Sequence, residues 1–164
     1  MHIEGQIAGA EKLTAVFGYW PSFHDAEVVW IHLDRGEQMD GAGPTLEALV
    51  HTFEISRDAD AIGQLALRHH VLVHLRFRRV VDLKLEDFNH QNALFGLEVT
   101  EVPDVQSAPN RFQVRLDSAY GMWASFRCRT VECVQVTPCT EDGFPMGDSS
   151  GPDDLDALDR LPST

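Results

Sequence analysis

The chain has 164 residues, of which 43% are hydrophobic and 24% are charged, and its formal net charge is −13. This length predicts one domain with a substantial hydrophobic core, and the acidity disfavours nucleic-acid binding through a basic surface. No run approaches the roughly 18 apolar residues that span a membrane, so we expect no membrane partner. The first residues show no basic start leading into an apolar segment, so we expect no secretory signal and a cytoplasmic location.

The first predicted element is a helix over residues 8–18. Leu13, Val16 and Phe17 recur at the spacing of one helical face, and Gly18 is a natural C-terminal stop. Pro21 then prevents the helix from continuing and favours an extended conformation for the residue before it.

From there to residue 138 the apolar residues alternate with the period of two that is typical of strands. The predicted strands cover residues 28–34, 46–56, 65–78, 80–85, 94–102, 112–117, 122–128 and 131–137. Most connections have hairpin length, and the order strand–helix–strand does not occur. The pattern predicts a mainly β fold of the α+β type, an antiparallel meander of about eight strands with the N-terminal helix packed on it.

The alternation also assigns residues to faces. It places Val29 on the same face as Ile31, and Phe95 on the same face as Leu97. We expect a single domain over residues 1–140. An acidic tail rich in Gly, Pro and Ser would follow over residues 141–164, with room for a short helix over residues 153–161.

The three cysteines fit no disulfide or metal pattern. Cys128, Cys133 and Cys139 are odd in number, and their spacing fits neither a CxxC redox motif nor a zinc knuckle. We expect Cys128 and Cys133 to be small buried apolar residues. We predict no metal ligands and no cofactor.

Residues 17–28, Phe-Gly-Tyr-Trp-Pro-Ser-Phe-His-Asp-Ala-Glu-Val, have the most unusual composition. The candidates there for a binding site or a structural corner are Trp20, Phe23, His24, Asp25 and Glu27. In a strand, His24 would point away from Asp25 and Glu27, which is a poor geometry for one metal site. We therefore favour a corner in which Asp25 bonds backbone amides and His24 packs against Trp20 or Phe23.

A stripe of histidine and arginine follows one face of the predicted strand over residues 65–78. Its members are Arg68, His70, His74 and Arg76. His70 and His74 would lie about 13 Å apart on a strand, too far to share a metal ion. The stripe is either the solvated outer face of a sheet, which we favour, or a basic binding surface.

A polar loop follows the predicted strand over residues 80–85. Asn89, His90, Gln91 and Asn92 could line a polar pocket, or their side chains could cap turns locally. We favour the local caps.

No motif for a known chemistry is present. The sequence lacks a G-x-S-x-G nucleophile elbow, a P-loop, a G-x-G-x-x-G turn and an HExxH pair. We therefore predict no catalytic residues and expect that the chain is not an enzyme.

Two segments resemble the immunity protein 50 family of small bacterial proteins. They are residues 17–28, quoted above, and residues 81–92, Val-Asp-Leu-Lys-Leu-Glu-Asp-Phe-Asn-His-Gln-Asn. The resemblance covers roughly residues 10–137. It implies a mostly β domain that neutralises a co-encoded polymorphic toxin by direct binding, and it carries over no catalytic residue. The net charge of −13 would suit a basic toxin domain such as a nuclease.

Two other functions remain open at this point. A metal-dependent or acid/base enzyme would use His24, Asp25 and Glu27 together with His70 or His90.

A homo-oligomeric structural protein would instead pair its sheet edges, or the surfaces around Trp20, Trp30 and Trp123. The abundance of histidine motivates the enzyme, with eight histidines in the chain.

Overall fold

The computed structural model describes residues 3–36, 43–59, 62–103 and 111–147. In this part of the chain a short 3-10 turn (Ile3–Gln6) and one helix, α1 (Ala10–Phe17), precede eight strands. The strands are β1 (Glu27–Asp34), β2 (Thr45–Ala59), β3 (Leu65–Arg78), β4 (Val81–Glu86), β5 (Ala93–Glu101), β6 (Phe112–Tyr120), β7 (Trp123–Cys128) and β8 (Thr130–Pro138). The mainly β prediction, with one N-terminal helix, is confirmed.

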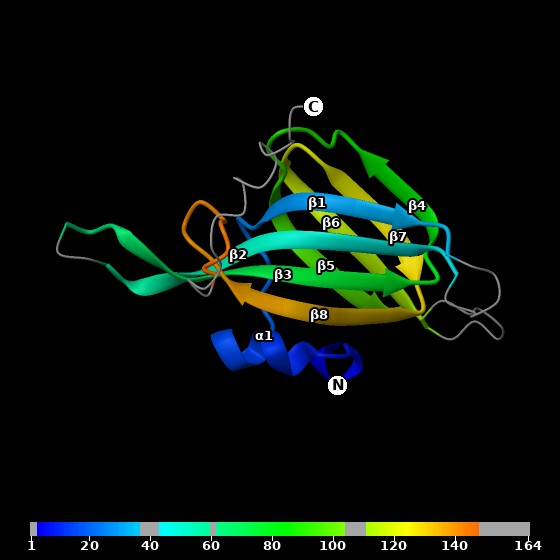
Figure 1. Ribbon diagram of the computed structural model, residues 1–164, viewed down its shortest axis with the longest axis horizontal. Helices are drawn as coiled ribbons and strands as arrows, with labels where there is room; N and C mark the ends of the chain where they lie inside the picture. The colour runs from blue at the N-terminus through cyan, green and yellow to red at the C-terminus, as the bar shows by residue number, and fades with distance from the viewer. Residues whose placement is uncertain (1–2, 37–42, 60–61, 104–110, 148–164) are drawn as a thin grey trace, which may run out of the picture.

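All neighbouring strands run antiparallel in one sheet, in the order β4-β7-β6-β5-β1-β2-β3-β8. The predicted meander holds within β1–β2–β3 and within β5–β6–β7. β4 and β8 depart from it. β4 follows β3 in the chain but pairs with β7, and β8 follows β7 but pairs with β3. The central joint between β1 and β5 is a single residue pair, Glu27 with Ala93. The sheet folds over itself there, so that one half faces the other (Figure 1).

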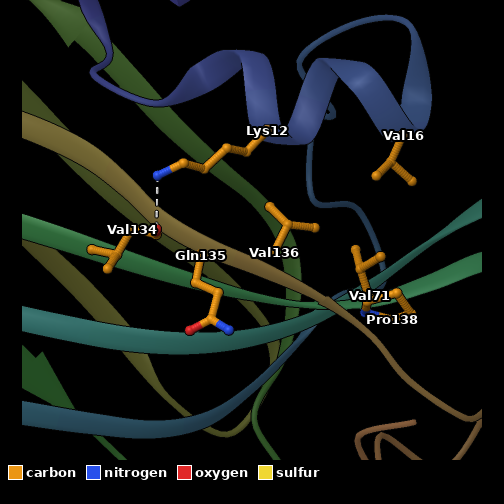
Figure 2. Close-up of a pocket in the computed structure, with 7 residues that line it drawn as sticks. All are labelled: Lys12, Val16, Val71, Val134, Gln135, Val136 and Pro138. Atoms are coloured by element: carbon orange, nitrogen blue, oxygen red, sulfur yellow. Dashed lines mark hydrogen bonds between the residues drawn. The ribbon is translucent and has the colours of Figure 1, made fainter. Parts of the chain in front are cut away.

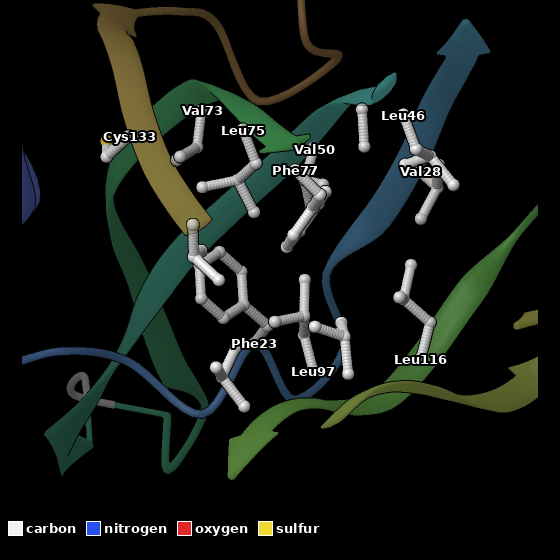
Figure 3. Close-up of a cluster of buried hydrophobic side chains, with 14 of the residues drawn as sticks. Phe23, Val28, Leu46, Val50, Val73, Leu75, Phe77, Leu97, Leu116 and Cys133 are labelled. Carbon is white, nitrogen blue, oxygen red and sulfur yellow. The ribbon is translucent and has the colours of Figure 1, made fainter. Parts of the chain in front are cut away.

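The hydrophobic core lies between these two halves. Phe77 of β3 and Phe126 of β7 are both buried and meet edge to face, with ring centroids 5.0 Å apart. Figure 3 shows side chains of both halves in this layer, with Val50 of β2 on one side and Leu97 of β5 and Leu116 of β6 on the other. Removing such side chains from water contributes about 1.5–3 kcal/mol each.

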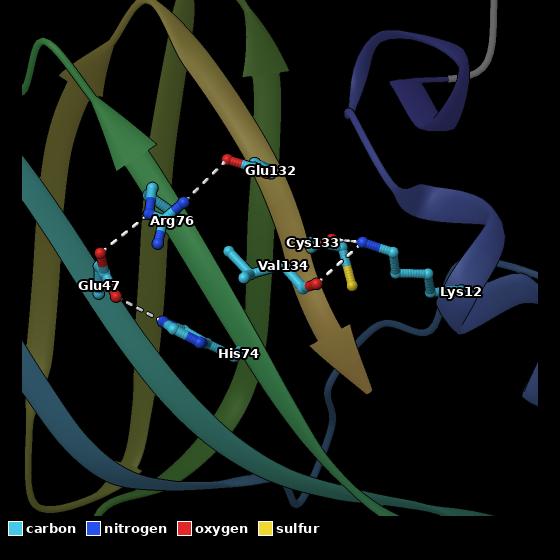
Figure 4. A network of polar contacts seen from close by, with 7 residues as sticks. All are labelled: Lys12, Glu47, His74, Arg76, Glu132, Cys133 and Val134. Atoms are coloured by element: carbon cyan, nitrogen blue, oxygen red, sulfur yellow. Dashed lines mark hydrogen bonds and ion pairs between the residues drawn. The ribbon is translucent and has the colours of Figure 1, made fainter. Parts of the chain in front are cut away.

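The N-terminal segment covers the edge of the sheet at β8. Ala8 pairs with this strand and accepts the N–H of Cys133 at 2.8 Å. Lys12 of α1 donates its Nζ to the carbonyl of Val134 at 2.8 Å (Figure 4). Gly9 has φ 74°, and a Cβ there would lie 2.3 Å from the Cys133 carbonyl oxygen, so only glycine fits. Unpaired sheet edges promote aggregation, and the N-terminal segment covers this edge at Ala8.

β-bulges overturn two of the expected face assignments. The pairing of β1 with β2 shifts register between Val28 and Trp30, and Val29 is exposed. The pairing of β5 with β6 shifts at its start, and Phe95 is 61% exposed although Leu97 is buried. An inserted residue reverses the alternation that period-two reasoning assumes.

Residues 139–147 fold back as a tight turn, which we call the C-terminal hairpin. Cys139 and Pro145 form an isolated antiparallel β-bridge, and the Met146 N–H donates to the Pro138 carbonyl at 3.0 Å. The domain boundary at residue 140 stays a prediction. The expected tail from residue 148 onward, including the helix over residues 153–161, lies outside the described residues.

Candidate functional site

Of the aromatic residues in residues 17–28, Phe17 and Phe23 are buried in the core and Trp20 packs against it, whereas Tyr19 is exposed. Phe23 is buried with φ 60°, and Trp20 packs edge-on against it with ring centroids 5.7 Å apart. The Asp25 N–H donates to the Leu94 carbonyl at 2.9 Å, and the Ala26 carbonyl accepts the Leu94 N–H at 2.8 Å. These contacts fasten the turn after α1 to β5.

The polar residues of the same segment do not form one group. His24 and Asp25 are both exposed, with His24 Nδ1 3.0 Å from Asp25 Oδ2. The His24 ring lies against Phe95, with centroids 6.3 Å apart, rather than in the expected contact with Trp20 or Phe23. Glu27 accepts the Asn92 N–H at 3.2 Å on Oε1. The structure thus keeps His24 and Asp25 together and directs Glu27 to a different neighbour.

We expect Asp25→Ala to lower the free energy of unfolding by about 1 kcal/mol through the backbone, because alanine is disfavoured in the left-handed region. Asp25 has φ 61°, and its carboxylate lies beside His24 rather than in the expected set of buried amide bonds. Urea unfolding measures the change. Asp25→Asn is the matched control, since asparagine also tolerates this region. Equal losses in the two variants would contradict a backbone origin.

The loop over residues 87–92 is held together by Asn92, which is buried. Its Oδ1 accepts the backbone N–H of Asn89 at 3.0 Å and of Met122 at 3.2 Å. Its Nδ2 donates to the Asn89 carbonyl at 2.8 Å. Gln91 donates its N–H to Asn89 Oδ1 at 3.1 Å, and His90 is exposed. The side chains of Asn89 and Asn92 cap backbone groups of this loop, and Asn92 also connects the loop to the start of β7.

The His/Arg stripe on β3 meets carboxylates from both neighbouring strands. Glu47 of β2 lies 2.5 Å from His74 Nε2 and accepts from Arg76 Nε at 2.9 Å. Arg76 also reaches Glu132 of β8 at 3.4 Å (Figure 4). Burial raises the pKa of Glu47, but the hydrogen bonds from Arg76 and His74 outweigh it and hold the pKa below its ordinary value. This part of the stripe is an ion-pair network on the outer face of the sheet.

The other end of the stripe joins a histidine that the sequence patterns did not single out. Nε2 of His51, on β2, lies 3.1 Å from Nδ1 of His70. The Phe53 ring packs against the His70 ring, with ring centroids 5.2 Å apart. Arg68 donates to Ser56 Oγ at 2.6 Å. His51 could be found only from strand register, because it lies on a different strand from the stripe.

We expect stability to fall as the pH drops below the ordinary histidine pKa of 6.5. Burial lowers the pKa of His51, and neighbouring His70 lowers it further, while Glu27 and Asp142 act in the opposite direction. The unfolded chain therefore binds this proton more readily, and acid favours unfolding. Melting temperatures between about pH 7.5 and about pH 5.5 measure the effect.

His51→Gln should flatten that pH dependence, since it removes the group that titrates. His90→Gln, at an exposed position, is the matched control and should keep the dependence of the natural chain. A fall in the melting temperature that is as steep in His51→Gln as in the control would contradict this account.

No described residues form a group of three His, Cys, Asp or Glu side chains that could hold a metal ion. Burial raises the pKa of the Cys128 thiol to about 12. The pKa of the Cys133 thiol is raised to about 11, and burial is the largest cause. Such thiols stay protonated and are poor nucleophiles. In the part of the chain that the structure describes, no helix is long and apolar enough to cross a membrane.

A groove runs beside α1. Its first part, of about 260 Å³, lies between the helix and β8 (Figure 2) and is lined by Lys12, Val16, Val71, Val134, Gln135, Val136 and Pro138. A second hollow of about 520 Å³ shares Val16, Val71 and Pro138 with it, so the two hollows are neighbours. This second part reaches Leu67 of β3 and Met146 of the C-terminal hairpin. We call the two hollows together the α1 groove.

The sequence patterns did not reveal the α1 groove. Its walls come from α1, β3, β8 and the C-terminal hairpin, which are far apart along the chain. Its lining is mostly apolar, and in the sequence each of these apolar residues fits the pattern of an ordinary strand or helix. Concave, mostly apolar surfaces of this kind are where proteins commonly bind other molecules.

Comparison with known proteins assigns the chain to a family. No curated protein and no solved structure matches it. A family model, Immunity protein 50, matches residues 9–139, which is most of the chain and includes α1, all eight strands and both segments of the resemblance. The family is not one of enzymes, in agreement with the lack of a catalytic motif. The chain belongs to the immunity protein 50 family.

Proposed function

We propose that this chain neutralises a cognate toxin by binding it directly in the cytoplasm. The observation that carries the proposal is the match of the immunity protein 50 family over residues 9–139. An immunity protein of this kind occludes or distorts its toxin and needs no reaction of its own.

The geometry is compatible with a binding protein. The two halves of the sheet enclose one core, and this gives a rigid support for a surface. On the outer face of β2, β3 and β8, Arg76 pairs with both Glu47 and Glu132. The α1 groove provides a concave apolar area beside this scaffold.

The charge of the chain favours a basic toxin. With a net charge of −13, the molecule attracts cationic proteins over a distance and speeds their association at low salt. A toxin domain that acts on nucleic acid would carry the complementary sign, since it must bind phosphates.

Co-expression tests the proposal. The toxin domain encoded beside this chain's own gene is expressed in a test bacterium with the chain or with a frameshifted copy of it. We expect growth to stop with the frameshifted copy and to be restored by the intact chain. Continued growth arrest, with both proteins visible in the cell extract, would refute neutralisation.

A further inference from the structure

The hairpin of β2 and β3 extends beyond the rest of the sheet (Figure 1). β1 pairs with β2 only as far as His51, and β8 pairs with β3 only from Val71 onward. Residues 54–59 of β2 and 65–68 of β3 therefore pair with each other alone among the described strands. We call residues 54–59 and 62–68 the arm. A two-stranded hairpin without further support is marginally stable in water.

The arm exposes apolar side chains. Ile55 and Leu67 are direct partners across the two strands, so they share one face, and they are 41% and 46% exposed. Ile62, near the tip, is 79% exposed. Apolar residues gathered on a projecting element mark an interaction site more often than isolated ones do.

The apolar face of the arm continues into the α1 groove. Leu67 lines the larger hollow together with Val16 and Met146, and Met146 is 60% exposed. We call Val16, Ile55, Leu67 and Met146 the arm surface. It combines a projecting element with a hollow at its base, and the anchor side chains of a partner commonly fill such hollows.

Charged groups of both signs lie around the arm surface, in a chain whose net charge is −13. Glu141 lines the hollow and Asp142 follows it on the C-terminal hairpin, and both are exposed. Two cations also line the α1 groove: Arg68 donates to Ser56 Oγ at 2.6 Å, and Lys12 donates to the Val134 carbonyl at 2.8 Å. An apolar centre with carboxylates at its rim complements a partner with an apolar side chain surrounded by Lys or Arg.

We propose that the arm surface is where the toxin docks. A basic toxin domain would place an apolar side chain against Leu67 and Met146 and its cationic side chains against Glu141 and Asp142. This inference rests on the proposed function and adds the surface that performs it.

The test is the affinity of the purified full chain for the toxin domain encoded beside its gene, prepared with its own reaction disabled. We expect Leu67→Glu to weaken binding at least about 30-fold, the loss of one central anchor. Phe95→Glu is the matched control, because Phe95 is also exposed and apolar but lies on β5. It should change the affinity by less than about twofold. Far-UV circular dichroism and melting establish that both variants are folded.

A second variant tests the rim. Glu141→Gln with Asp142→Asn should slow association several-fold at low salt and have little effect at high salt, because rim charges act through steering. Association rates that are unchanged at low salt would contradict the role of these carboxylates.

Three outcomes would overturn the inference. If the natural chain binds the toxin and Leu67→Glu binds it equally well, the docking surface is wrong while the proposed function stands. If the natural chain does not bind the toxin, the proposed function fails and the inference falls with it. If Leu67→Glu only converts a dimer of this chain to a monomer and keeps the toxin affinity, the arm surface belongs to a second copy.

Discussion

Phe77→Ala is expected to lower the free energy of unfolding by about 4 kcal/mol, the usual cost of truncating a fully buried phenylalanine. Phe77 has no exposed surface and meets Phe126 at a centroid distance of 5.0 Å. The two rings belong to β3 and β7, which lie in opposite halves of the folded sheet. The substitution therefore removes packing between the halves as well as within one of them.

Urea unfolding followed by tryptophan fluorescence measures the loss. Phe95→Ala deletes the same group at an exposed position of β5 and should cost less than about 1 kcal/mol. Similar losses in the two variants would mean that the halves do not depend on this contact. A large loss only in Phe77→Ala would support the folded-over sheet.

Asn92→Ala is expected to lower the free energy of unfolding by about 3 kcal/mol, because it leaves buried backbone groups without partners. Its Oδ1 accepts the N–H groups of Asn89 and Met122, and its Nδ2 donates to the Asn89 carbonyl. Met122 is fully buried, so water does not readily replace the lost bond. The amide thus ties the loop after β4 to the start of β7.

The same unfolding experiment measures this change. His90→Ala, two residues away and exposed, is the matched control and should change stability by no more than about 0.5 kcal/mol. If Asn92→Ala were as mild as the control, the polar residues of this loop would not be structural. They would then return to consideration as a site for a ligand.

Local periodicity was sufficient to predict α1 and the eight strands of this fold. Leu13 and Phe17 are buried on one face of α1, as their spacing predicts, and Phe112, Val114 and Leu116 of β6 all face the core. These assignments depend only on neighbours within a few residues, which is the range over which sequence patterns carry information.

The order of the strands could not be predicted in this way. The pairing of β4 with β7 and of β8 with β3 joins segments that are distant in the chain, and hairpin-length connections favour a simpler meander. The bulge that exposes Phe95 is likewise set by register with β6 rather than by its own neighbours. Tertiary pairing decides both features.

The candidate residues were recognisable by type but not by role. The stripe of Arg68, His70, His74 and Arg76 looks basic in sequence, yet Glu47 and Glu132 lie beside it from adjacent strands. The arm surface has no motif, because Leu67 and Met146 are brought together only by the hairpin at the end of β8. Surfaces formed by several elements leave no contiguous signal in a sequence.

Direct association with the toxin is the central claim, and isothermal titration of the inactivated toxin domain into the full chain tests it most directly. We predict a stoichiometric complex whose affinity falls as salt is raised from about 50 to about 500 mM, because an acidic surface meets a basic one. No heat of binding, with the two proteins eluting separately on sizing at low salt, would contradict the account.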